Sequence, residues 1–276
     1  MFIVTDPAES PNHTGSPHPS ATDDVLAALL DRAAQHQAAM VLMERYDLPD
    51  PATATHAMAT AARRHGRAVG AVARALLIAP EPRRAARSWF PSRVWTSAPP
   101  VGFLAGSAAT RPQDVLDAAV DAATGYAQTA QGDIQTVTPV RGGLDLRQAR
   151  GFSPAFVRQF AHVDGDETAC AIALNTRRSV TVPDVTRCDI FDRPALETLA
   201  RAEIRAVHSV PILAGGGAGV VSVHYPRPGA TPSHATRVAL SGIAAQTGAW
   251  LQWYGRTAML DALEDLHQHA CRFPAM

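Results

Sequence analysis

The sequence predicts an α+β protein, in which a helical N-terminal part precedes a central antiparallel sheet flanked by helices. Two observations predict this class. Residues 23–79 carry apolar and alanine-rich patterns at helical spacing, interrupted by prolines. Residues 206–213 and 218–225 are two apolar, β-branched runs on either side of a glycine-rich segment at 214–217, which is typical of a β-hairpin.

Composition and charge limit the function classes. The chain has 276 residues, 46% of them hydrophobic and 18% charged, as in a soluble globular protein of one large or two ordinary domains. The formal net charge is zero, so no global field attracts nucleic acid or a membrane. Cys170, Cys188 and Cys271 lack CxxC spacing and fit a reducing compartment. With no signal peptide pattern and no run of about 20 apolar residues, we expect a cytoplasmic protein.

The N-terminal helices follow a tail. Residues 1–22, rich in Pro, Ser and His, are expected to be a disordered tail. Asp23 or Asp24 then caps a helix that ends near Tyr46, before the prolines of 48–51. Its predicted buried face consists of Val25, Leu26, Leu29, Leu30, Ala33, Gln37, Met40 and Val41. A second helix from Pro51 to about 65 and a third at 67–78 complete a bundle over 23–79.

This bundle resembles an ANTAR domain, the three-helix RNA-binding module of bacterial transcription antiterminators, over residues 34–77. The matching residues are Gln37, Ala38, Val41, Leu42, Met43, Ala54, Met58, Ala61, Arg64, Arg67, Val69, Val72 and Ala73. The chain departs from the family pattern at Ala39-Met40, where Lys-Gly is usual, and at Thr55, Gly66 and Ala68. A missing lysine removes one contact to RNA phosphate.

The resemblance implies RNA stem-loop binding by Gln37, Arg63, Arg64 and Arg67. The residues also allow a structural interpretation. The three arginines can be the solvated end of a helix, where cations favour the helix dipole, and Gln37 can be a polar position on a buried face.

Residues 80–110 are predicted to be a linker, because a connection this long and rich in Pro and Ser is uncommon within one domain. Trp89, Phe90 and Trp95 are too many large aromatic residues for a free linker. We expect them to dock on a domain surface or across a dimer.

Residues 111–255 form the second predicted domain, followed by a helical tail at 256–276. A helix from Val115 to about 128 opens it, and a second helical stretch at 232–254 closes it. Two amphipathic flanks suggest a homodimer, although packing on the sheet of the same domain would account for the same pattern.

This second domain resembles a GAF domain, a small-molecule sensing module of bacterial signalling proteins, over residues 112–253. The segments that carry the resemblance are 132–135, 150–156, 168–174, 180–185, Phe191, 204–212 and 219–225. The resemblance implies a pocket between the sheet and the segment 160–199, lined by Cys170, Asp184, Phe191, His208, Ser209, Ser222 and His224. Asp184 can instead cap the turn after its strand, and Phe191 can simply fill the core.

The two histidines of the hairpin, His208 and His224, could hold a metal or act as acid and base only if they lay on the same face. If Leu213 pairs with Ala218, His208 lies opposite Val223 and His224 opposite Val207, which places the histidines on opposite faces. Motifs of nucleophilic or phosphate-binding enzymes are absent from the sequence, and a helix beginning near Cys170 is the only hint of thiol chemistry. We therefore expect no enzyme and no metal, and a ligand that is a small organic molecule of unknown identity.

Taken together, the sequence predicts a cytoplasmic regulator in which a GAF-like sensor controls an ANTAR-like antitermination module. One alternative is a GAF-fold ligand-binding or dimerisation protein whose helical domain binds protein rather than RNA. A cysteine-dependent redox enzyme on a GAF fold is the third.

Overall fold

The computed structural model describes residues 3–4, 21–83, 85–104, 111–137, 142–165, 168–213 and 219–272. The chain divides into two compact units. We call Met1–Ser20 with Ala98–Gln252 the sheet unit, and Ala21–Ser97 with Trp253–Met276 the helical unit. Each unit is described separately below.

Within the described residues, seven strands of the sheet unit form one antiparallel sheet in the order β1-β5-β6-β7-β2-β3-β4. The strands are β1 (Ile3–Val4), β2 (Gln131–Val137), β3 (Leu144–Arg150), β4 (His162–Val163), β5 (Val180–Val182), β6 (Ala206–Ile212) and β7 (Gly219–Tyr225). The central strands β6 and β7 are buried along nearly their whole length, which explains why neither alternates between apolar and polar residues.

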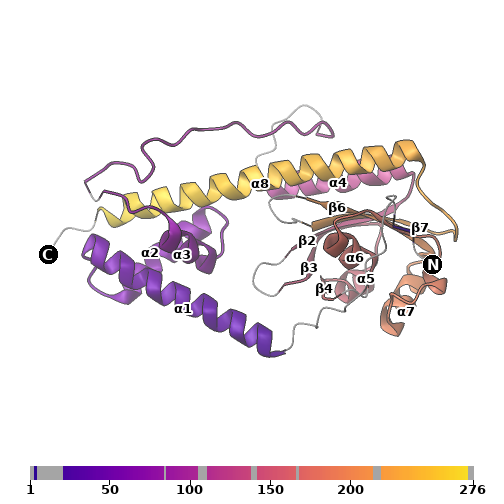
Figure 1. The fold of residues 1–276 in the computed structure, drawn as a ribbon, viewed down its shortest axis with the longest axis horizontal. Helices are drawn as coiled ribbons and strands as arrows, with labels where there is room; N and C mark the ends of the chain where they lie inside the picture. Colours follow the sequence, from indigo (N-terminus) through magenta and orange to yellow (C-terminus); the bar gives the residue numbers. More distant parts are fainter. Residues whose placement is uncertain are drawn as a thin grey trace. The chain divides into compact units, whose positions relative to one another are not determined.

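Different helices cover the two faces of this sheet (Figure 1). On one face lie α4 (Pro112–Ala127) and the first half of α8 (His234–Ala270), packed on Ile134, Val210 and Val221. On the other lie α5 (Pro154–Gln159), α6 (Ala169–Thr176), a 3-10 turn η1 (Val185–Arg187) and α7 (Arg193–Arg201), packed on Val182, Val207 and Val220. We call these the helix-covered face and the pocket face.

The register of the β6–β7 hairpin confirms the predicted one. His208 pairs with Val223, Val207 pairs with His224, and Ser209 pairs with Ser222. Since side chains alternate along a strand, His208 lies on the helix-covered face and His224 on the pocket face. The predicted turn at 214–217 lies outside the described residues.

The helical unit contains the three helices that the sequence predicts. They are α1 (Ala21–Tyr46), α2 (Pro51–Arg64) and α3 (Val69–Ile78). Asp50 caps α2, with its side chain accepting a hydrogen bond from the Thr53 amide at 2.7 Å, and Pro51 occupies the first turn.

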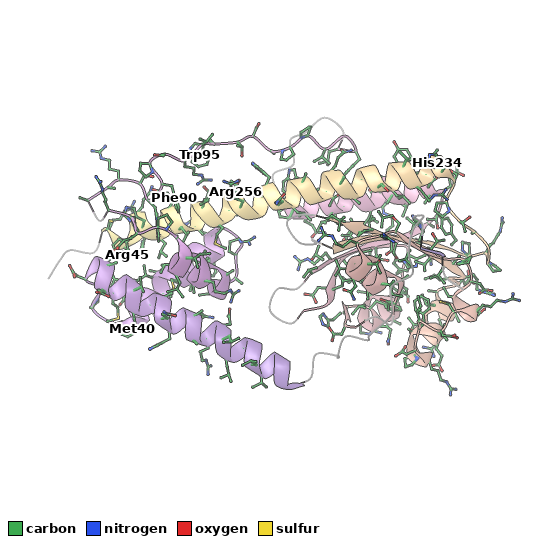
Figure 2. All side chains as sticks on the ribbon, viewed as in Figure 1. Met40, Arg45, Phe90, Trp95, His234 and Arg256 are labelled. Carbon is green, nitrogen blue, oxygen red and sulfur yellow. The ribbon has the colours of Figure 1, made fainter. Side chains whose placement is uncertain are left out.

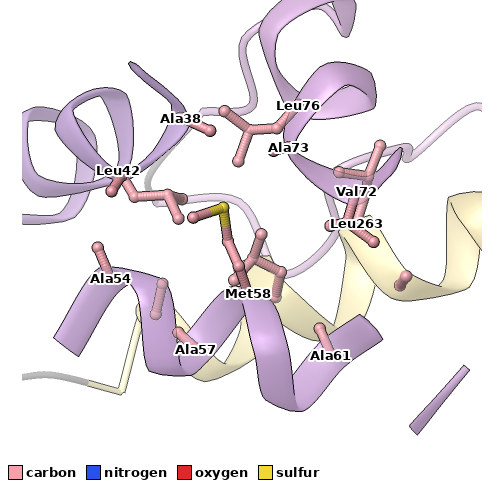
Figure 3. Close-up of a cluster of buried hydrophobic side chains, with 14 of the residues drawn as sticks. Ala38, Leu42, Ala54, Ala57, Met58, Ala61, Val72, Ala73, Leu76 and Leu263 are labelled. Atoms are coloured by element: carbon pink, nitrogen blue, oxygen red, sulfur yellow. The ribbon is translucent and has the colours of Figure 1, made fainter. Parts of the chain in front are cut away.

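The C-terminal half of α8 is a fourth helix of this unit, where the sequence predicts a separate helical tail at 256–276. Leu263 lies among buried residues of α1, α2 and α3 in one core (Figure 3). Leu266 and Ala262 belong to the same core. The His267 ring accepts a hydrogen bond from the Tyr46 hydroxyl at 2.7 Å and donates one to the Ala86 carbonyl at 2.9 Å. A four-helix core therefore replaces the predicted three-helix bundle.

The first part of the predicted linker also belongs to the helical unit. Trp89 is buried, its ring nitrogen donates to the Pro80 carbonyl at 2.8 Å, and its amide donates to Glu264 at 2.9 Å. Phe90 stacks on Trp89, whereas Trp95 is 72% exposed. Docking on a domain surface is thus confirmed for two of the three predicted aromatic residues.

The predicted buried face of α1 is wrong except at Val41, which packs against the core. The helix buries Ala38, Ala39 and Leu42 instead, because small side chains permit close packing against α3, the element that α1 contacts most. Most of the residues that were expected to be buried are exposed. Their exposed fractions are 47–62% for Val25, Leu26, Leu29, Leu30 and Met40. Figure 2 shows Met40 on the outer side of α1.

One further expectation is corrected, and one alternative that the sequence left open is settled for the flanking helices. Within the predicted N-terminal tail, Ile3 and Val4 form strand β1, which pairs with β5; the other residues of 1–20 lie outside the described ones. The flanking helices α4 and α8 bury their apolar faces, including Leu116 and Leu240, on the sheet of the same unit. The amphipathic pattern of these flanks is therefore accounted for without a dimer.

Candidate functional site

The sheet unit holds a pocket between the pocket face of the sheet and helices α5, α6 and α7. About 420 Å³ of space lies along its lining, a figure that includes the part open to solvent. The lining residues are Asp133, Gln135, Leu146, Phe156, Phe160, Thr168, Ala169, Cys170, Phe191, Leu199, Val207, Ser209, Ser222 and His224.

A row of polar side chains crosses the floor of this pocket. Asp133 on β2 pairs with Ser222 on β7, which pairs with Ser209 on β6. The Ser209 and Ser222 hydroxyls share a hydrogen bond of 2.9 Å, and both residues are buried. Because side chains alternate along a strand, Asp133, Ser209 and Ser222 all lie on the pocket face.

Asp133 and His224 are hydrogen-bonded to each other at the floor of the pocket. His224 Nε2 lies 2.6 Å from Asp133 Oδ2, and both side chains are more than 90% buried. The rings of Phe152 and Phe156 meet the His224 ring edge-on, with centroids 5.1 and 6.0 Å away. The carboxylate therefore fixes the proton on Nε2, and the aromatic rings fix the orientation of the imidazole.

Two buried polar atoms of the pocket residues have no hydrogen-bond partner among the described residues. They are Gln135 Oε1 and His224 Nδ1. An unpaired polar atom in a buried position raises the free energy of the empty protein. Both atoms are themselves buried, so a bound molecule would contact them only after a movement of the pocket lining.

Cys170 lies at the start of α6, behind the capping residue Thr168, whose hydroxyl is 3.0 Å from the Cys170 sulfur. Burial raises the pKa of the Cys170 thiol to about 12, and the nearby Asp133 charge acts in the same direction. The thiol is therefore protonated at neutral pH, which is unfavourable for a nucleophile.

Five of the seven predicted ligand residues line the pocket, namely Cys170, Phe191, Ser209, Ser222 and His224. The structure places His208 on the opposite face, where its Nδ1 lies 2.8 Å from the Thr181 hydroxyl. Asp184 caps η1 and accepts hydrogen bonds from the Thr186 amide and hydroxyl, which hold the pKa of its carboxyl below the ordinary value. The capping role is the structural interpretation that the sequence had left open.

Sequence reasoning missed Asp133 and Gln135, although both lie in a segment that carries the family resemblance. Polar residues at alternate positions of a strand, separated by Ile134, were the available signal. Phe156 and Phe160 were also missed, since the apolar pattern alone does not distinguish a pocket wall from the core.

The residues predicted to contact RNA lie in the helical unit, on α1, on α2 and in the connection between α2 and α3. Gln37 is exposed on α1, not buried. Arg63 and Arg64 are exposed in the last turn of α2, where Arg64 forms an ion pair with Asp265 of α8. Arg67 is half-buried, and its Nε has no hydrogen-bond partner among the described residues.

The fold and this pocket define a class of protein, the α+β modules that enclose a small pocket between an antiparallel sheet and its connecting helices. A model of the GAF domain family matches residues 109–252, which is more than half of the chain. This protein therefore belongs to the GAF domain family. The match does not extend to residues 34–77, so the resemblance of that segment to an ANTAR domain stays a prediction.

Several solved structures are similar to about half of this chain. A domain of a putative two-component sensor histidine kinase from Sinorhizobium meliloti is 22% identical, with 55% of this chain and 99% of that chain covered and a TM-score of 0.45. The GAF domain of an Acinetobacter phosphoenolpyruvate-protein phosphotransferase is 16% identical, with 54% and 85% covered and a TM-score of 0.43. The comparison with curated proteins gives no match.

Among the residues that the structure describes, no helix is long and apolar enough to cross a membrane. Nor do the described His, Cys, Asp and Glu side chains form a group of three or more that could hold a metal ion.

Proposed function

We propose that this protein is a signalling sensor, in which the GAF pocket binds a small organic molecule and the helical unit carries the response. The observation that carries the proposal is the pocket of the GAF domain, which lies between the sheet and its connecting helices and is lined by Phe156, Phe160 and Phe191. Apolar and aromatic lining with a few polar residues is typical of sites for small organic molecules.

Helix α8 is the element through which we propose that the response passes. Its residues Leu240 and Ile243 belong to the core of the sheet unit, and Leu263 and Leu266 belong to the core of the helical unit. A ligand that binds one arrangement of the sheet unit better than another would shift the population of states that share this helix.

Thermal denaturation in the presence of fractionated small-molecule extracts tests ligand binding. A fraction that contains the ligand raises the melting temperature, because binding to the folded state alone stabilises it. Val207→Phe places a larger side chain in the pocket and removes the shift, while the circular dichroism spectrum stays unchanged. A fraction that shifts both proteins equally acts elsewhere, and if no fraction shifts the wild type, the proposal is wrong.

We propose that Cys170 is a lining residue rather than a nucleophile, since its thiol is protonated at neutral pH. Cys170→Ser should keep ligand binding within about threefold and show the same behaviour as the wild type in peroxide and sulfoxide turnover assays. Turnover by the wild type that disappears in Cys170→Ser would instead favour a redox enzyme.

For the helical unit we propose self-association through the exposed apolar face of α1. Leu26, Leu30, Ala33, Gln37 and Met40 follow one another at steps of four and three residues, the spacing of a coiled-coil seam, and are exposed. Leu26→Gln combined with Leu30→Gln should shift the molar mass measured by light scattering from dimer to monomer. Arg32→Gln, an exposed change on the same helix, is the control, and a monomeric wild type would contradict the proposal.

RNA binding is the second candidate for this unit, favoured by the exposure of Arg63 and Arg64 at the end of α2. The test is binding of an RNA with two hairpins and unpaired loops at low and near-physiological salt, beside a duplex control. Arg63→Ala with Arg64→Ala should weaken loop-dependent binding and reduce its salt dependence. Asp265→Asn frees Arg64 from its ion pair and should strengthen binding. Equal binding by all these proteins would exclude the arginine face as an RNA site.

A further inference from the structure

The polar side chains that line the GAF pocket are bonded to one another. Three hydrogen-bonded pairs account for every polar lining residue that the structure describes except Gln135. The pairs are Asp133–His224 at 2.6 Å, Ser209–Ser222 at 2.9 Å and Thr168–Cys170 at 3.0 Å. Each pair stays bonded whichever of its two atoms carries the shared proton. A ligand that needs hydrogen bonds would therefore compete with bonds that the protein already makes.

Unpartnered polar atoms of the lining do not reach the surface of the pocket. Gln135 Oε1 and His224 Nδ1 lack a partner among the described residues, but both atoms are themselves buried. The surface that the lining presents is almost wholly apolar. A polar ligand group placed against it would lose its hydration without gaining a hydrogen bond.

The described lining also offers no free charge to an ionic ligand. None of its residues is an arginine, and the chain has no lysine. The Asp133 carboxyl is bonded to His224, so a cation would have to compete with the imidazole for it. Anions and cations alike would therefore lose more in hydration than the pocket returns.

The walls of the pocket consist of aliphatic and aromatic side chains, among them Leu146, Phe156, Phe160, Phe191, Leu199 and Val207. The rings of Phe156 and Phe160 lie with centroids 4.7 Å apart and planes tilted by 45°. Aromatic rings attract a further ring in edge-to-face or offset contact, beyond the gain from burying its area. An aromatic hydrocarbon group therefore suits these walls.

We propose that the GAF pocket of this protein takes small uncharged apolar molecules, and that an aromatic or alkyl-aromatic hydrocarbon group is the part that enters it. Affinity then comes from the removal of apolar surface from water rather than from hydrogen bonds or ion pairs. This inference rests on the proposed ligand-binding function and narrows it.

Isopropenylbenzene, benzamide, benzoate and benzamidine test the inference, because these probes share one branched, ring-bearing shape and differ in polarity and charge. Their affinities for the full chain are measured by NMR titration. The signals followed are the methyl groups of Leu146, Leu199 and Val207 in the pocket, and those of Val210 and Val221 on the helix-covered face. We expect the pocket signals alone to shift. Isopropenylbenzene should bind about tenfold more tightly than benzamide, and the two ions should bind more weakly than benzamide.

Val207→Thr introduces a hydroxyl group into the apolar lining with little change of shape. It should reduce the preference for isopropenylbenzene over benzamide about fivefold. Val210→Thr makes the same change on the same strand but on the helix-covered face, so the affinities should keep their wild-type ratio. The order of the probes on the wild type decides the inference even where Val207→Thr does not fold.

The outcomes separate the inference from the function on which it rests. Benzamide or either ion binding as tightly as isopropenylbenzene, with pocket signals shifted, would overturn the inference and leave ligand binding supported. Equal shifts of Val210 and Val221 would place the probe outside the pocket and would also overturn it.

If no probe shifts the pocket signals, the inference fails. The proposed function then stands only if a fraction of the extract raises the melting temperature of the wild type and not that of Val207→Phe. If neither probes nor fractions act, both fail.

Discussion

The hairpin of β6 and β7 presents one histidine to each face of the same sheet, and the two lie in very different surroundings. On the helix-covered face, His208 contacts the Thr181 hydroxyl among buried apolar residues, and its Nε2 has no partner among the described residues. On the pocket face, His224 lies beside Asp133, in a pocket that also holds Ser209 and Ser222.

The difference shows that the surroundings of a polar residue depend on the face of the sheet where its side chain lies, and not on the strand that carries it. The helix-covered face needs close packing against α4 and α8, so an isolated polar group there is held neutral. The pocket face tolerates several polar groups because they bond to one another or face free space. Substitutions on the helix-covered face should therefore change the free energy of unfolding, and substitutions on the pocket face should change ligand binding.

The neighbouring residues Ile134 and Gln135 test this contrast most strongly, since they lie on opposite faces of β2. Ile134 is fully buried on the helix-covered face, and Ile134→Ala should lower the free energy of unfolding by about 4 kcal/mol. Gln135→Leu removes an unpartnered buried oxygen and should leave stability unchanged or higher, while ligand binding changes because Gln135 lines the pocket. Urea denaturation measures both, and equal losses in the two variants would contradict the contrast.

Gly219 allows β7 to pair closely with β2 in the middle of the sheet. A Cβ atom at this position would collide with the backbone carbonyl oxygen of Gln135. Gly219→Ala should therefore destabilise the protein by about 3 kcal/mol and also disturb the pocket. Gly125→Ala is the matched control, because a Cβ there meets no atom within 4 Å; chemical denaturation should show no loss of stability for it.

The acid dependence of stability should come from the helix-covered face. Burial lowers the pKa of His208 from 6.5 to about 4, and the charge of Arg237 adds to this. The unfolded chain thus takes up the proton first as the pH falls. Stability contributed by neutral His208 is fully present above about pH 6.5 and decreases toward pH 4, by about 2 kcal/mol between about pH 7 and pH 5.

Denaturation curves at several pH values measure this effect. His208→Gln should reduce the slope of stability against pH in that window, because glutamine does not titrate. His234→Gln removes an exposed histidine at the start of α8 and should keep the wild-type slope (Figure 2). An unchanged slope in His208→Gln would assign the dependence to other groups.

The fold of the sheet unit and much of its pocket could be predicted from the sequence. Turn chemistry and β-branched runs predicted the pairing of Val207 with His224 and placed His208 on the opposite face from His224. His208 was nevertheless expected in the pocket, and the structure corrects this. Asp133 was not identified, because a contact between β2 and β7 depends on strand order, which local patterns do not encode.

The helical unit was predicted less well, for a reason visible in α1. Helices were found from capping residues and prolines, which act locally. The buried face of α1 was not found, since Ala38 and Ala39 lie inside while Leu26 and Leu30 lie outside. Size alone favours the leucines as core residues, and only the close approach of α3 explains why the alanines are buried.

The serine pair on the pocket face provides the smallest and most specific prediction. The side-chain hydroxyls of Ser209 and Ser222 share one hydrogen bond of 2.9 Å. Either single change to alanine leaves one buried hydroxyl with a lost partner and should cost about 1 kcal/mol. The double change removes both hydroxyls and should cost less than the sum of the singles, so a double-mutant cycle yields a coupling of about 0.5–1 kcal/mol. Additive losses of stability would mean that each hydroxyl has its own hydrogen-bond partner, such as water in the pocket. The two serines would then be stabilised by contacts in the pocket rather than by their bond across the strands.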